Sequence, residues 1–129
     1  MQNAEPEKER AGNRQRDIAA RTYSFALRVI AVVRAMPREV VATTIARQLI
    51  RSGTSIGANV EEAEAGHSKA DFISKINVAR REARETLYWL RLVGDSNLVP
   101  KTRLEGLTAE VDELVRILTA IVRNARRKR

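Results

Sequence analysis

Apolar residues recur every three or four positions through almost the whole chain, and this helical spacing constrains the fold more than any other feature of the sequence. The first such stripe runs from Ile18 to Met36. Three more run over residues 41–63, 72–90 and 104–125. Side chains at this spacing lie on one face of an α-helix, so the sequence predicts an all-α protein with four amphipathic helices.

Two of the three breaks between the stripes contain residues that end or begin helices. Pro37 ends the first helix, because proline has no amide hydrogen and pushes the preceding residue out of the helical region. Gly66 is suited to capping the second helix. Ser68 and Asp71 resemble a capping box that begins the third, with Asp in place of the usual Glu.

The third break lies between Gly94, which ends the third helix, and Pro100, which opens the fourth. The second helix is predicted over residues 38–65, so all the connections are short. Long helices joined by short turns pack as antiparallel neighbours. The sequence therefore predicts an antiparallel up-down-up-down four-helix bundle.

The chain of 129 residues fits one domain with a single core. Residues 1–12 are polar and lack periodicity, so we expect a disordered lead-in there. The bundle is predicted over residues 13–125, and residues 126–129 form a basic C-terminal tail. The apolar face of the first helix is wide enough to meet more than one neighbour, which favours a homo-oligomer.

Composition excludes several classes of protein. The absence of Cys excludes disulfides, thiolate zinc sites and cysteine nucleophiles, and it fits a reducing compartment. The N-terminal residues show no secretory signal, and the longest apolar run, Val29 to Val33, is too short to span a membrane. We expect a cytoplasmic protein with no membrane partner.

The net charge of +8 is concentrated at the C-terminus, where residues 123–129 supply five cations and no acid. Those cations are Arg123, Arg126, Arg127, Lys128 and Arg129. One interpretation is a solvated helix end, since cations suit the negative pole of a helix. The other is a contact with the phosphates of nucleic acid. Aromatic residues are too few for a platform that stacks several bases.

Two short motifs resemble catalytic or metal sites and are better explained by structure. Residues 53–57, GTSIG, match the nucleophile elbow of serine hydrolases, but helical periodicity runs through them where the elbow needs a preceding strand. The glycines instead let another backbone approach closely. Glu64 and His67 have the spacing of half a di-metal site, yet the chain has only one His. No phosphate-binding loop is present. We expect no enzyme activity, no cofactor and no metal.

A polar stripe lies beside the apolar stripe of the second helix and includes Arg51. The third helix carries Glu82 and Glu85. We predict that Arg51 reaches one of these acids, in the same subunit or a neighbouring one. Such a pair would fix the register of the helices more than it would stabilise them, because semi-buried ion pairs roughly break even against apolar packing.

The central stretch also resembles a known family. Four blocks carry the resemblance, and they are QLIRSGTSIGAN, EA, SKADF and EAxETxYWL between Gln48 and Leu90. Periodicity alone gives no reason for these blocks to occur together. They are similar to the signature of the bacterial four-helix-bundle proteins related to the 23S rRNA intervening sequence protein. The similarity extends over roughly residues 17–125.

The resemblance implies a bundle that assembles into a homopentamer and contacts RNA or DNA. A distant relative, the accessory variability protein of diversity-generating retroelements, binds a reverse transcriptase and nucleic acid as a pentamer. A partner resembling a reverse transcriptase, or a ribosomal one, is therefore implied for this chain, and catalysis is not. The alternative is a protein–protein adaptor or scaffold whose charge only keeps it in solution.

Overall fold

The computed structural model describes the backbone of residues 7–128 and the side chains of residues 18–128. Its elements are α1 (Glu7–Arg34), α2 (Val40–Ala65), α3 (Lys69–Asp95) and α4 (Lys101–Arg127). The described part of the chain contains no strand. The prediction of an all-α fold with four helices is confirmed. No helix within the described residues is both long enough and apolar enough to cross a membrane.

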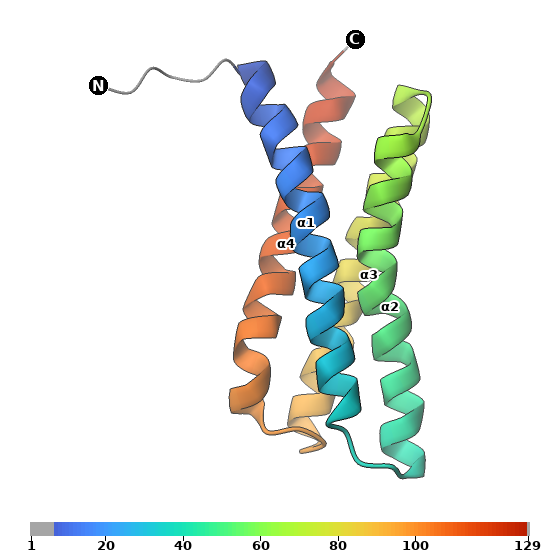
Figure 1. Ribbon diagram of the computed structural model, residues 1–129, viewed down its shortest axis with the longest axis vertical. Helices are drawn as coiled ribbons and strands as arrows, with labels where there is room; N and C mark the ends of the chain where they lie inside the picture. The colour runs from blue at the N-terminus through green and yellow to red at the C-terminus, as the bar shows by residue number, and fades with distance from the viewer. Residues whose placement is uncertain (1–6, 129) are drawn as a thin grey trace, which may run out of the picture.

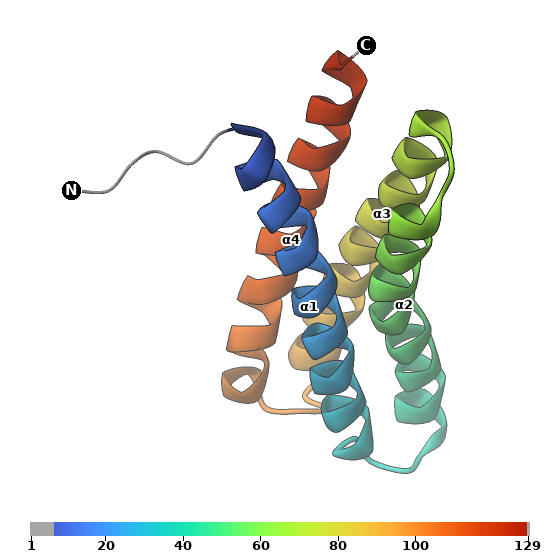
Figure 2. The ribbon, with the colours of Figure 1, turned by 45° about the horizontal axis from the view of Figure 1, so that its top comes forward.

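Each helix packs against two others, so the four surround one core. α2 lies between α1 and α3, and α4 packs against α3 and, less extensively, against α1. Within residues 7–128 the diagonal pairs do not approach closely. In Figure 1, α1 descends, α2 ascends, α3 descends and α4 ascends, so α1 begins and α4 ends at the top of the view. Figure 2 shows the same order of helices with the top turned forward.

The first and last helices are longer than predicted. α1 begins at Glu7, so it includes part of the segment expected to be a disordered lead-in, whereas residues 1–6 lie outside the described residues. The added segment, residues 7–12, is rich in Glu, Lys and Arg, which favour helices even where no apolar stripe is present. α4 continues through Arg127 into the predicted tail, and Arg129 lies outside the described part.

Local capping explains where α2 and α3 begin. The side chain of Ser68 accepts a hydrogen bond from the Asp71 amide at 3.1 Å, as the predicted capping box requires. Glu39 caps α2 in the same way and accepts from the amides of Val41 and Ala42 at 3.2 and 2.6 Å. This second cap was not predicted, because Glu is not among the usual N-cap residues.

The core contains mainly aliphatic side chains, with Phe25, Leu49 and Leu114 fully buried. Three polar side chains, Thr22, Ser52 and Thr86, are also fully buried. Every buried side-chain polar atom in the described residues has a hydrogen-bond partner. The buried hydroxyls therefore do not carry the cost of an unpaired polar group.

Gly53 and Gly57 of α2 pack closely against α1. A Cβ atom at Gly53 would lie 2.9 Å from the methyl groups of Val29, and one at Gly57 would lie 3.3 Å from the Thr22 hydroxyl. Contacts this short are tighter than ordinary packing allows. The predicted role, which is to let another backbone come near, is confirmed at Gly57, where backbone atoms of Thr22 would lie 3.4 Å from a Cβ; at Gly53 the space is filled by the Val29 side chain.

Candidate functional site

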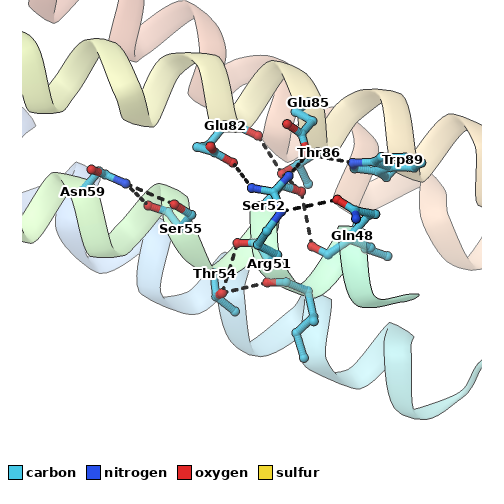
Figure 3. A network of polar contacts seen from close by, with 12 residues as sticks. Gln48, Arg51, Ser52, Thr54, Ser55, Asn59, Glu82, Glu85, Thr86 and Trp89 are labelled. Carbon is cyan, nitrogen blue, oxygen red and sulfur yellow. Dashed lines mark hydrogen bonds and ion pairs between the residues drawn. The ribbon is translucent and has the colours of Figure 1, made fainter. Parts of the chain in front are cut away.

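Arg51 lies at the centre of a polar network between α2 and α3 (Figure 3). Its Nη1 atom lies 3.2 Å from Glu82 Oε2, and its Nη2 atom contacts Glu85 Oε2. Its Nε donates to Gln48 Oε1 at 3.3 Å. The structure thus brings Arg51 together with both of the predicted acids, within one chain. Neither acid was favoured over the other by the sequence, and the arginine contacts both.

The network continues from the surface into the core through side chains one turn apart. Glu85 accepts a hydrogen bond from Trp89 Nε1 at 2.9 Å. The Oγ atoms of Ser52 and Thr86, both buried, are hydrogen-bonded at 2.9 Å and join α2 to α3 beneath the ion pairs. The arginine side chain is half exposed, whereas the two hydroxyl-bearing residues are fully buried.

The serine of the GTSIG motif lies in the middle of α2, where no strand precedes it. Asn59 Nδ2 donates to its backbone oxygen at 2.8 Å and to its Oγ at 3.1 Å (Figure 3). His67 lies exposed in the turn after α2. Ser55 therefore has a helical neighbour for its hydroxyl and no adjacent imidazole, so this motif contributes to the helix and not to a nucleophilic site.

Glu64 and His67, the pair with metal-site spacing, are both exposed. Partial desolvation, together with the charge of Glu61, raises the pKa of the Glu64 carboxyl. Within residues 18–128 no three His, Cys, Asp or Glu side chains are grouped so that they could hold a metal ion.

The basic residues of the predicted tail lie at the end of α4. Arg123, Arg126, Arg127 and Lys128 are exposed, whereas Arg129 lies outside the described residues. This end of α4 is at the same end of the molecule as the start of α1 and the turn between α2 and α3 (Figure 1). The tail cations therefore belong to one end of the bundle.

A pocket of about 330 Å³ separates this end of α4 from α3. Its lining consists of Arg80, Thr119, Val122, Arg123, Arg126 and Arg127. We call the site formed by these six residues the basic pocket. Arg80 comes from α3 and was missed by sequence reasoning. The sequence offers one indirect signal for Arg80. In an antiparallel pair of helices, residues at similar distances from the connecting turn lie opposite each other, which places Arg80 of α3 across from the C-terminal half of α4.

A second arginine cluster, also missed, joins α1 to α4. Arg21 Nη2 and Nε contact the two oxygens of Glu110 at 2.7 and 3.1 Å, and Nη1 lies 3.3 Å from Glu113. Arg21 donates these hydrogen bonds to the two carboxylates, which raises the pKa of its guanidinium above the ordinary value; Glu110 has the larger effect and Glu113 the smaller. Arg21 is thus a paired, structural cation.

Several large apolar side chains are exposed on the outer surface of the bundle. Tyr23 and Leu27, one turn apart on α1, are 62% and 53% exposed. Val40 and Val41 at the start of α2, and Tyr88 on α3, are exposed as well. Apolar surface of this kind favours association with another protein surface.

Comparisons with known proteins agree on one family. The family model described as 23S rRNA-intervening sequence protein matches residues 14–120. Among solved structures, a crystal structure of a protein with unknown function from the S23 ribosomal protein family of Bacteroides thetaiotaomicron is similar, with a TM-score of 0.79 and 34% sequence identity. The similarity covers 85% of this chain and 98% of that one. The comparison with curated proteins gave no match.

Proposed function

Because the chain belongs to the family of 23S rRNA-intervening sequence proteins, we propose that it is a non-enzymatic oligomeric bundle that binds RNA or DNA through its basic end. The family membership inferred from the central blocks of sequence is confirmed. The observation that carries the proposal is the gathering of Arg80 with three arginines of α4 around one pocket.

The arginines of the basic end keep their charge, as several other exposed arginines of the described residues do. Arg21, Arg51 and Arg116 form ion pairs with acids of the same chain. Within residues 18–128, no ion pair involves Arg80 or the described tail cations. Cations whose charge is not neutralised inside the protein attract polyanions, and phosphates are the anions that nucleic acid offers.

Self-association supports the proposal from a second direction. The exposed Tyr23 and Leu27 provide apolar area on α1 for another subunit. We extend the proposal to antiparallel four-helix bundles assembled into a homopentamer, the assembly that the family resemblance implies. An oligomer multiplies a weak phosphate contact, because after one subunit binds, the others meet the same strand at high effective concentration.

The protein would then act as an accessory factor to an enzyme that works on nucleic acid. A partner resembling a reverse transcriptase, or a ribosomal partner, follows from the family resemblance. In that role the protein would deliver or retain a strand through its basic surface.

Salt dependence of binding tests the proposed function. Deletion of residues 126–129 should flatten the plot of log affinity against log salt by up to about 3–4 units, at roughly 0.9 per phosphate contact on duplex. The matched control replaces four exposed arginines elsewhere, Arg47, Arg81, Arg91 and Arg103, by Gln. Both variants remove four positive charges. The deletion should therefore reduce the salt slope more than the control does only if the tail contacts phosphates directly.

Three outcomes are informative. A larger loss of slope in the deletion supports the basic end as the contact. Equal losses in both variants would show that net charge alone attracts the polyanion. If the wild-type protein binds neither RNA nor DNA, the proposed function is wrong, and a protein–protein adaptor becomes the reading to pursue.

A further inference from the structure

We propose that the basic pocket is a discrete site for one phosphate group of a nucleic-acid strand, and that Arg80 is its inner contact. This assignment rests on the proposed function for the source of the phosphate. It goes further in naming a bounded site made by two helices, where the tail alone would give a diffuse contact. It also gives a role to an arginine that lies far from the tail in the sequence.

Arg80 is held in position before any ligand arrives. Its side chain is half-buried, and its Nε donates to Asn77 Oδ1 on the same helix at 3.0 Å. That hydrogen bond orients the plane of the guanidinium, and within residues 18–128 neither Nη group has a hydrogen-bond acceptor. A donor fixed in advance loses less conformational entropy when it binds an anion.

The remaining walls of the basic pocket supply charge but few competing acceptors. Val122 is 4% exposed and forms an apolar wall. The Thr119 hydroxyl donates to the Val115 carbonyl at 2.7 Å, so its proton is already used within α4. Among residues 18–128, no acidic side chain lines the pocket. The available donors are therefore guanidinium groups, which recognise phosphate through paired N–H groups.

The helix dipole does not explain this arrangement. Cations in the last turn of α4 interact favourably with the negative end of that helix, which accounts for Arg126 and Arg127. Arg80 lies in the interior of α3 and gains nothing from either helix end. Four like charges around one concavity repel each other, and a bound phosphate removes that cost.

The size and lining of the basic pocket indicate what is recognised. A volume of about 330 Å³ lies at the small end of the usual range for ligand sites, roughly 300–1,000 Å³. It can admit a phosphate with the adjoining sugar. None of its described lining residues is aromatic, so they offer no ring on which a base could stack. We therefore expect recognition of the backbone, with little preference for sequence.

Arg80→Gln tests the assignment, with Arg81→Gln as the matched control. Arg81 is the next residue of α3, is exposed and does not line the pocket, so both variants lose one charge from the same helix. For binding to single-stranded RNA by the full chain, R80Q should weaken affinity about tenfold or more and lower the salt slope by roughly 0.7. R81Q should change the affinity less than about twofold.

Arg80→Lys separates geometry from charge. The lysine keeps the charge but has no planar fork and no Nε to bond with Asn77. We expect R80K to restore the salt slope while recovering only part of the affinity. Thermal melts followed by circular dichroism should show all three variants folded, because Arg80 forms no ion pair among the described residues.

Inorganic phosphate provides a probe of the pocket that does not depend on RNA. Titrated into the full chain at constant ionic strength, it should shift the NMR resonance of the Arg80 Nε–H group and leave that of Arg81 unmoved. If RNA binds but R80Q and R81Q behave alike and phosphate shifts neither, the pocket assignment is overturned and the proposed function stands. If phosphate shifts Arg80 but neither RNA nor DNA binds, the nucleic-acid source is overturned, and with it the proposed function.

Discussion

At the scale of single residues, arginines in different parts of the fold are suited to different roles because their neighbours differ. Arg51 lies between two helices with Glu82 and Glu85 within reach, so its charge is neutralised inside the chain. Arg80 has an amide acceptor for Nε and no ion-pair partner among the described residues. The first is suited to fixing structure and the second to meeting an anion.

Arg51→Met should disturb assembly more than folding. The arginine side chain is 48% exposed, so losing its ion pairs should change the free energy of unfolding by less than about 1 kcal/mol. Its expected role is the alignment of α2 with α3, and misaligned subunits should fail to form the folded assembly. Analytical ultracentrifugation measures this directly. A variant that assembles like the wild type would show that Arg51 does not set the register.

Glu64→Gln should change how stability depends on pH. Because the fold raises the pKa of this carboxyl, the folded state holds its proton more tightly than the unfolded state does. Stability is therefore lost as pH rises through that pKa. Glutamine cannot ionise, so the melting temperature of E64Q relative to the wild type should be higher at pH 7 than at pH 4. A relative melting temperature that falls between pH 4 and pH 7 would contradict this.

At the scale of helices, the contact between α1 and α4 is the least extensive of the four and includes two ion pairs. Arg21 of α1 forms a two-pronged pair with Glu110 and a further contact with Glu113, both on α4. The α1–α2 contact differs in kind, because it depends on the absence of side chains at Gly53 and Gly57. Substitutions at the two contacts should therefore have different effects on stability.

Arg21→Met should weaken the attachment of α1 to α4. Its side chain is 24% exposed and that of Glu110 is 21% exposed, so the change leaves a partly buried carboxylate without its partner. We expect a loss of about 1–2 kcal/mol in the free energy of unfolding by urea. Arg116→Met is the control, because its pair with Asp112 is largely exposed and should be worth less than about 0.5 kcal/mol. Equal losses of stability in the two variants would show that the Arg21 pair attaches α1 to α4 no more strongly than an exposed ion pair would.

Gly53→Ala and Gly106→Ala should have opposite signs, although both replace a glycine within a helix. Alanine favours a helix over glycine by roughly 1 kcal/mol. At Gly53 the new methyl would lie 2.9 Å from Val29, so overpacking should give a net loss of about 1–2 kcal/mol. At Gly106 the nearest atom is the end of the Arg28 side chain, which can move, so stability should rise by up to about 1 kcal/mol. Thermal melts of the two variants check the signs.

The sequence allowed the helices to be predicted better than the contacts that select among surfaces. Pro37, Gly66 and Ser68 act on their own neighbours in the chain, so their effects are visible in a local pattern. Arg21 and Glu110 are far apart in sequence and meet only when α1 and α4 pack together. Arg80 is similar, because its placement beside the tail depends on the packing of α3 against α4. The C-terminal cations can be identified from the sequence because they lie close together in it. The pocket that they form with Arg80 depends on tertiary packing and cannot.

At the scale of the whole molecule, the proposed homopentamer makes a prediction about mass. The chain weighs 14.5 kDa, so native mass spectrometry should give a particle of about five times that mass. Its dissociation should depend on concentration, because subunit association stabilises by mass action. Replacing the exposed Tyr23 and Leu27 by Ser should shift the particle toward the monomer without unfolding it. A particle of unchanged size would place the subunit contact elsewhere.

The position of the helix ends decides where a label or fusion can be attached. α1 begins and α4 ends at the same end of the bundle, and the last turns of α4 line the basic pocket (Figure 1). An acidic or histidine-rich purification tag joined after α4 would therefore compete with a polyanion for the arginines of the pocket. The α3–α4 connection lies at the far end, and its exposed Asn97 has a left-handed backbone with a φ of 61°. A fluorophore joined there, in an untagged chain, would report binding from a distance without occupying the surface being measured.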